Sequence, residues 1–117
     1  MKRTRSVVAI IIVLLILGGV VVAVRRHDRQ TAIAEVKATR QLRYSGKAGD
    51  SVLVLLKQNA ATVATQNESG GTVVQNIDGL TNGSGGTWSY YVNGKLGTVS
   101  PSQYKTKQGD EVVWDFQ

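Results

Sequence analysis

An uninterrupted apolar run near the N-terminus constrains this chain more than any other feature. Residues 7–24 contain no charged and no strongly polar side chain. As a helix the run would be about 27 Å long, which nearly matches the hydrocarbon core of a bilayer at about 30 Å. We therefore predict a single N-terminal transmembrane helix at residues 7–24, preceded by a basic flank at residues 1–6.

The apolar run ends directly in Arg25 and Arg26, which bears on whether it is retained. A cleaved export signal usually has a shorter apolar region, of about 7–15 residues, before a site of small residues. Retention as a signal anchor is therefore favoured. Cleavage at Val21-Val22-Ala23 is the alternative, and it would secrete the rest of the chain.

Both flanks of the run are basic, and their balance sets the predicted topology. Lys2, Arg3 and Arg5 precede the run, whereas Asp28 offsets one of the arginines that follow it. The more basic flank of a membrane helix tends to stay in the cytoplasm. We expect a single-pass protein of the cell membrane whose C-terminal domain is extracytoplasmic.

The positive net charge of the chain belongs to these flanks. Residues 1–30 hold six Lys and Arg against one Asp, and residues 31–117 hold eight against seven Asp and Glu. Basic membrane flanks pair with anionic lipid headgroups, whereas a nucleic-acid binder carries its basic patch on the folded domain. The sequence therefore predicts membrane lipid as a partner and no nucleic acid.

The remaining chain is long enough for one small domain. There is no Cys, so neither disulfides nor thiolate metal ligands hold the fold together. We predict a juxtamembrane tether at residues 25–42 and an extracytoplasmic domain at residues 43–117, which is near the lower size limit for a domain without covalent staples. Within the tether, residues 30–41 fit a short helix and Val36 to Leu42 fit a strand, and both remain open.

One helix and several strands are expected in this domain. Apolar residues recur at helical spacing from Val52 to Ala60, and either Asp50 or Ser51 is placed to cap that helix. Alternating or β-branched stretches predict strands at 62–66, 72–77, 87–92 and 111–116. In the second of these strands we expect Val73 and Ile77 on one face.

Turns and a loop separate these strands. Asn93-Gly94 predicts a type I′ hairpin turn, and Gly109-Asp110 predicts a second tight turn. The glycine-rich stretch at 78–86 predicts a loop without regular structure. The structural core is expected at four aromatic residues on the inner faces of the last two strands: Trp88, Tyr90, Trp114 and Phe116. The fold class is therefore α+β.

A short internal echo is present. The pattern Tyr-x-x-Lys-x-Gly-Asp-x-Val begins at Tyr44 and again at Tyr104. One interpretation is a duplicated binding motif. The interpretation that we favour is a pair of tight Gly-Asp turns, each of which opens a regular element.

Three segments together carry a family resemblance: Tyr44 to Lys57 (YSGKAGDSVLVLLK), Trp88 to Gly94 (WSYYVNG) and Gly109 to Phe116 (GDEVVWDF). They resemble the transcobalamin-like C-terminal domain family, whose fold also forms the small β-domain of intrinsic factor and transcobalamin. The resemblance implies a β-grasp-like domain, with one helix packed on an antiparallel or mixed sheet, of the kind carried by bacterial surface and secreted proteins. In the cobalamin carriers the ligand lies between this domain and a large helical domain, so the resemblance does not carry cobalamin binding over to this chain.

Catalytic chemistry is not expected. The single histidine, His27, lies in the basic flank, and the acidic residues are spread over turns and one strand. No convergent set of nucleophilic or titratable groups is visible. We therefore predict no enzyme activity, no metal site and no cofactor.

Binding is the expected function, and one aromatic residue is the leading candidate for it. Tyr91 points to the opposite face from Tyr90, and it shares that face with Ser89 and Asn93. An exposed aromatic ring offers a large contact area at low entropic cost. We predict that these three residues contact a small-molecule, glycan or protein ligand. The competing hypothesis is a structural or accessory subunit of a membrane complex.

Overall fold

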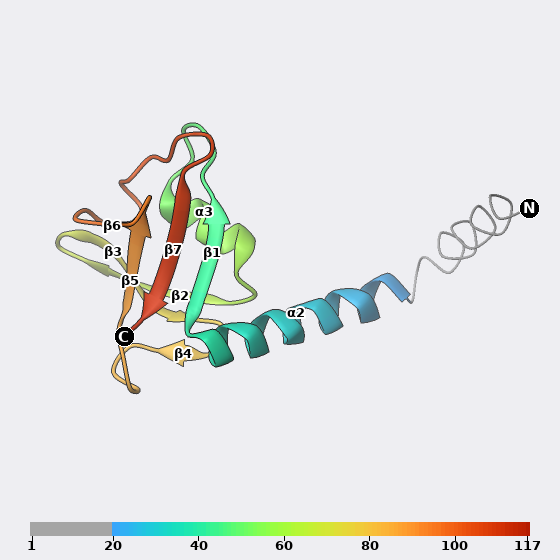
Figure 1. The fold of residues 1–117 in the computed structure, drawn as a ribbon. Coiled ribbons are helices and arrows are strands. Elements are labelled where there is room, and N and C mark those ends of the chain that lie inside the picture. The colour runs from blue at the N-terminus through green and yellow to red at the C-terminus, as the bar shows by residue number, and fades with distance from the viewer. Residues whose placement is uncertain (1–19) are drawn as a thin grey trace, which may run out of the picture. The chain divides into compact units, whose positions relative to one another are not determined.

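The structure, a computed structural model, describes residues 20–117, with side chains from residue 29 onward (Figure 1). Residues 31–117 form one compact unit. Among the described residues, none of the helices combines the length and the apolar character needed to cross a bilayer. Most of the transmembrane helix predicted at 7–24 lies outside the described residues.

The predicted tether is helical for most of its length, because α2 (Val20–Thr39) continues until just before the first strand. Val36 is buried and packs into the core of the domain. Arg40 ends the helix with a positive φ of 60°, and its N–H donates to the carbonyl of Val36 at 2.6 Å. The helix predicted at 30–41 is therefore confirmed up to Thr39. The alternative, a strand from Val36 to Leu42, is wrong at Val36 to Thr39, because the strand starts only at Gln41.

A four-stranded antiparallel sheet forms the front layer in Figure 1. In spatial order its strands are β1 (Gln41–Ser45), β7 (Glu111–Phe116), β5 (Trp88–Val92) and β6 (Lys95–Leu96). Trp88 and Tyr90 of β5 are buried, and so are Trp114 and Phe116 of β7. These four aromatic side chains confirm the predicted core face.

α3 (Val52–Asn59) lies behind this sheet and covers its buried face (Figure 1). The Ser51 hydroxyl oxygen accepts a hydrogen bond from the N–H of Val54 at 3.1 Å, so Ser51 is the N-cap. Leu55 and Leu56 are fully buried against the sheet. The predicted helix and its cap are confirmed.

The second sheet is a three-stranded antiparallel ribbon of β2 (Val63–Glu68), β3 (Gly71–Ile77) and β4 (Leu80–Thr81). A β-bulge interrupts the register, because Ala64 pairs with Asn76 whereas Thr65 pairs with Val74. The extra residue in β3 breaks the two-residue alternation of side chains. As a result Val74, and not the predicted Val73, is buried on the same side as Ile77. The short β4 also corrects the prediction that residues 78–86 contain no regular element.

The hairpin turn at Asn93-Gly94 has the predicted backbone. The φ angle is 51° at Asn93 and 79° at Gly94, and a type I′ turn requires positive values at both positions. β5 and β6 pair across the turn, with Val92 opposite Lys95. The type I′ prediction is confirmed.

The two segments of the internal echo lie against each other. The N–H of Gly46 donates to the carbonyl of Asp110 at 2.7 Å, and the N–H of Thr106 donates in the same way to Asp50 at 2.8 Å. The N–H of Gly49 also donates to the carbonyl of Thr106 at 3.1 Å, and the N–H of Gly109 donates to the carbonyl of Gly46 at 3.3 Å. The segments therefore form two interlocking tight turns, in agreement with the favoured interpretation.

Candidate ligand-binding groove

The predicted ligand residues lie on the outer face of the four-stranded sheet. Tyr91 and Ser89 are half-buried there, and Asn93 is exposed at the end of the strand. Tyr91 stands opposite Val113 on one side and Leu96 on the other. Side chains opposite each other on paired strands share a face, so this face carries a short apolar row across its middle.

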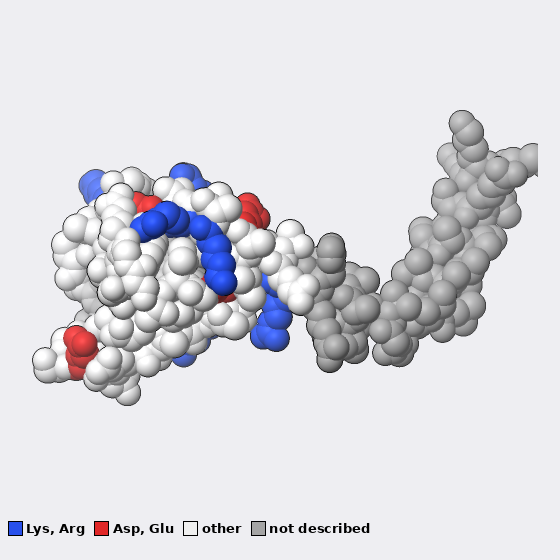
Figure 2. Space-filling model, turned by 90° about the horizontal axis from the view of Figure 1, so that it is seen from below, with Lys and Arg blue, Asp and Glu red and all other residues white. Residues whose placement is uncertain are grey.

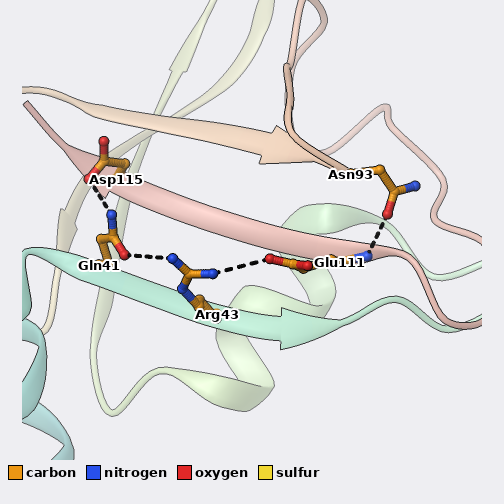
Figure 3. A network of polar contacts seen from close by, with 5 residues as sticks. All are labelled: Gln41, Arg43, Asn93, Glu111 and Asp115. Carbon is orange, nitrogen blue, oxygen red and sulfur yellow. Dashed lines mark hydrogen bonds and ion pairs between the residues drawn. The ribbon is translucent and has the colours of Figure 1, made fainter.

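The side chain of Asn93 is already engaged within the protein. Its Nδ2 donates to Oδ1 of Asp110 at 2.9 Å, and its Oδ1 accepts the N–H of Glu111 at 2.9 Å. The second of these bonds is drawn in Figure 3. The donation from the backbone N–H of Lys107, followed by that from Asn93, holds the pKa of the Asp110 carboxyl below its usual value. Asn93 thus fastens the hairpin turn to the start of β7.

Four other polar side chains on this face also bond to one another (Figure 3). Arg43 pairs with Glu111 at 3.2 Å and donates to Gln41 at 3.1 Å, and Gln41 donates to Asp115 at 3.2 Å. An exposed ion pair of this kind contributes little to stability. These bonds hold the polar side chains on either side of the apolar row to one another.

A groove of about 310 Å³ lies beside β5, between β3 and the segment that follows β6. Its floor is aromatic, formed by Trp88, Tyr90 and Trp114. Leu96 and Val99 flank it with 56% and 47% of their surface exposed. Among the described residues only one other large hydrophobic side chain is exposed, Val54 on α3, and it does not line the groove.

Specific contacts hold the rim of this groove in place. The Tyr90 hydroxyl donates to the carbonyl of Val99, and the N–H of Gly97 donates to the carbonyl of Tyr90 at 2.8 Å. A Cβ atom at Gly97 would collide with the Tyr90 ring, so only glycine fits there. Ser100 Oγ donates to the carbonyl of Thr72 at 2.8 Å and ties this segment to β3. The rim is therefore fixed to both walls of the groove.

The groove is nearly uncharged. Glu68, at the end of β2, is the single charged residue among those that line it, and it is exposed. Burial, followed by the neighbouring Tyr104, raises the pKa of the Tyr90 hydroxyl, which therefore stays protonated at neutral pH. The site thus offers apolar surface, one carboxylate and backbone groups.

A second hollow, of about 340 Å³, lies between α2, β1 and the end of α3. Glu35, Arg43 and Asn59 contribute to its lining, and none of its lining residues is aromatic. Across the face of the domain shown in Figure 2, acidic and basic side chains are scattered among a larger neutral surface. Within the described part of the chain, no group of three or more His, Cys, Asp or Glu side chains is placed to hold a metal ion. The groove beside β5 is accordingly the best-formed candidate.

Sequence reasoning missed most of this groove. Of the predicted ligand residues, Ser89 alone also lines it. The available signal was the occurrence of Leu96 and Val99 in a stretch that is otherwise small and polar, without a strand pattern to bury them. The meeting of this stretch with β3 has no local signature in the sequence.

Comparison with known proteins places the chain in one family. No curated protein and no solved structure gives a significant match to it. One family profile, described as "Domain of unknown function (DUF4430)", matches residues 49–117, which is more than half of the chain. The match begins at the turn before α3 and includes every strand except β1. The chain therefore belongs to the DUF4430 family, a family of transcobalamin-like domains.

Proposed function

We propose that this protein is an extracytoplasmic binding module, anchored in the membrane through residues 7–24, whose groove beside β5 takes the apolar part of a ligand. The observation that carries the proposal is the pair of exposed hydrophobic side chains, Leu96 and Val99, beside an aromatic floor. Single exposed hydrophobics are common on protein surfaces. Two that flank one groove, with bulky rings beneath them, are typical of a ligand site.

The size and the rigidity of the groove support this proposal. A volume of about 310 Å³ is at the lower end of the range for ligand pockets, so we expect it to hold a small ligand or one part of a larger one. The bonds from Tyr90 to Val99 and from Ser100 to Thr72 fix the rim before a ligand arrives. A preformed site loses less conformational entropy on binding.

The finer family relationship is part of the same proposal. The helix behind an antiparallel sheet supports a β-grasp-like fold related to the small β-domain of intrinsic factor and transcobalamin. The apolar run and its basic flanks support a single-pass anchor in the cell membrane. No catalytic step and no cofactor form part of the proposed function.

Tryptophan emission provides a direct test, because the chain has two Trp residues and both Trp88 and Trp114 line the groove. We would titrate corrinoids, cell-wall glycans and short peptides into the purified full-length chain in a mild non-ionic detergent. The proposal predicts a saturable emission change with at least one class of compound. Val99→Ser should remove the change, and the matched control Val54→Ser should keep it.

Two results would count against the groove. A signal that persists in Val99→Ser but disappears in Tyr91→Ala would assign binding to the outer face of the sheet. No saturable change with any compound, while both serine variants remain folded, would favour the structural or accessory subunit instead.

A further inference from the structure

β2 is an edge strand, and its outer side is exposed. In the described part of the chain it lies at one end of the order β2-β3-β4 and pairs with β3 alone. Every residue from Ala64 to Glu68 is exposed. The strand contains neither proline nor lysine, two residue types that commonly protect an edge from pairing with another chain. β2 therefore presents an unprotected strand edge.

The register of β2 and β3 shows which main-chain groups face this edge. The carbonyls of Thr72 and Val74 accept hydrogen bonds from side chains outside the sheet, so they point away from β2. Their partners in β2 are Asn67 and Thr65. Opposite residues of an antiparallel pair either exchange their hydrogen bonds or both direct their N–H and C=O groups outward. The N–H and C=O groups of Thr65 and Asn67 therefore point away from β3, toward the free edge.

These outward groups are accessible. Within the part of the chain that the structure describes, no hydrogen bond from another segment reaches the main chain of Thr65 or Asn67. The edge is not covered by side chains either, since both residues are exposed. Unpaired N–H and C=O groups on an exposed edge are a template for a further strand. Thr65 and Asn67 thus offer two donors and two acceptors, with Gln66 between them.

We propose that β2 pairs antiparallel with β2 of a second copy of this chain, around a two-fold axis at Gln66. In this register Thr65 lies opposite Asn67 of the second copy, and symmetry forms the same pair again. All the outward groups of Thr65 and Asn67 are then bonded. The two sheets join into one continuous sheet. The inference concerns a surface other than the groove and does not depend on the proposed function.

The charge of the strand favours a second copy in this register. Glu68 is the single charged residue of β2, and the axis places it opposite Ala64 of the second copy. At about 3.4 Å per residue the two Glu68 positions lie about 14 Å apart along the strands, which exceeds the screening length of about 8 Å. A register centred on Glu68 would place two carboxylates opposite each other, which is destabilising. Self-pairing around Gln66 therefore opposes no like charges.

The dimer is expected to be weak. A single pair of short strands buries less surface than specific, stable interfaces, which bury about 1,200–2,000 Å². Chains anchored in one membrane, as proposed above, would be held at a raised effective concentration. A covalent trap is therefore the suitable way to detect the pairing.

Cysteine cross-linking of the full-length chain in non-ionic detergent tests the pairing, because the chain has no Cys of its own. Residues opposite each other in a non-hydrogen-bonded pair have Cα atoms about 4.5 Å apart, within the range of a disulfide. Gln66→Cys should therefore form a disulfide dimer under mild oxidation. The matched control is Ala64→Cys, exposed on the same strand, whose two copies would be about 14 Å apart. Because a disulfide requires proximity, we expect Gln66→Cys to cross-link about tenfold faster than the control, or more.

Further substitutions in the Gln66→Cys chain test the strand pairing and its register. Thr65→Pro removes an outward N–H and leaves the ladder to β3 in place, so cross-linking should slow to the rate of the control. Ala64→Lys places a cation opposite Glu68 of the second copy and should raise the rate by about twofold to fivefold, whereas Ala64→Glu should lower it by a similar factor. Thermal melts check that each variant is folded.

Equal cross-linking rates of Gln66→Cys and Ala64→Cys would overturn the pairing, and equal rates of the Ala64→Lys and Ala64→Glu forms would overturn the register. Hydrogen exchange distinguishes other occupants of the edge. The N–H groups of Thr65 and Asn67 should exchange more slowly as the protein concentration rises. Slow exchange at every concentration would assign the edge to another segment of this chain. Slowing only after addition of a basic probe, the hexapeptide of three Val-Lys repeats, would assign it to a peptide partner. Either result would overturn the second copy.

Discussion

At the scale of single residues, the hydroxyl group of Tyr44 joins three parts of the core. It donates to the carbonyl of Val52 at 2.7 Å and accepts the indole N–H of Trp114 at 2.9 Å. Burial raises the pKa of this hydroxyl well above its usual value, so the group remains neutral and keeps both bonds. The same bonds link the end of β1, the start of α3 and the centre of β7.

Replacing Tyr44 by Phe should lower the free energy of unfolding by about 1–3 kcal/mol, because two buried polar groups lose their partner. Chemical denaturation of the full-length chain measures this change. Tyr91→Phe is the matched control, since that ring is on the outer face, and we expect no measurable effect there. Equal losses in the two variants would show that the buried hydroxyl has no special role.

Asp110 should make the stability of the domain depend on pH. Its pKa lies below the ordinary 3.8, mainly through the N–H of Lys107. A lowered carboxyl pKa adds stability above the unfolded-state value, and this stability is lost as the pH falls through the folded-state value. The Asp110→Asn variant should therefore have a lower melting temperature than the parent protein at pH 7. The two melting temperatures should coincide near pH 2. An unchanged gap between the two melting curves at both pH values would contradict this account.

Residue-level sequence reasoning succeeded where a simple period governs the side chains. The alternation in β5 and β7 correctly placed Trp88, Tyr90, Trp114 and Phe116 in the core, because side chains of a regular strand alternate between two faces. Sequence reasoning did not find the second role of Asn93, which is to donate a hydrogen bond to Asp110, a residue distant in sequence. Hydrogen bonds between distant turns follow from the tertiary fold and leave no local pattern.

At the scale of elements, the two interlocking turns depend on a close backbone approach at Gly46. A Cβ atom there would lie 2.6 Å from the carbonyl oxygen of Lys107 and 2.8 Å from Cβ of Thr106. We predict that Gly46→Ala lowers the free energy of unfolding by about 1–3 kcal/mol, the usual cost of overpacking. Gly70→Ala is the control, because a Cβ there meets no atom within 4 Å. Equal stability of the two variants, by denaturant titration, would be inconsistent with this packing.

The hairpin turn between β5 and β6 gives a second prediction at this scale. Gly94→Val should destabilise the domain by about 1–2 kcal/mol, because a β-branched residue resists positive φ. Gly94→Asn should be tolerated better, since asparagine adopts that conformation more readily. Thermal melts compare the two variants. Equal melting temperatures of the valine and asparagine variants would argue against the φ of 79° at this position.

Elements with local signals were predicted correctly, and those without them were not. The cap at Ser51 and the Asn93-Gly94 turn follow from short-range chemistry, and both are confirmed. The bulge in β3 depends on how two strands pair, so no local pattern favoured Val74 over Val73. The extension of α2 up to Thr39 was likewise left open, because its residues fit a helix or a strand equally well.

At the scale of the whole molecule, the groove is assembled from parts that are far apart in sequence. Val73 of β3, Trp88 of β5 and Val99 after β6 reach it from three different segments. No window of the sequence contains this arrangement. The sequence therefore predicted an α+β domain and its aromatic core, whereas the site it proposed, around Tyr91, remains a prediction on the other face of the same sheet.

The central claim is that ligands bind in the groove, and methyl NMR of the full-length chain in detergent tests it most directly. The chain would be labelled at valine and leucine methyl groups and titrated with the compound that gives the largest tryptophan emission change. We predict shifts at Val99 and Val73, with Val54 and Val113 unchanged. Shifts centred on Val113, or no methyl shift at saturation, would contradict the claim.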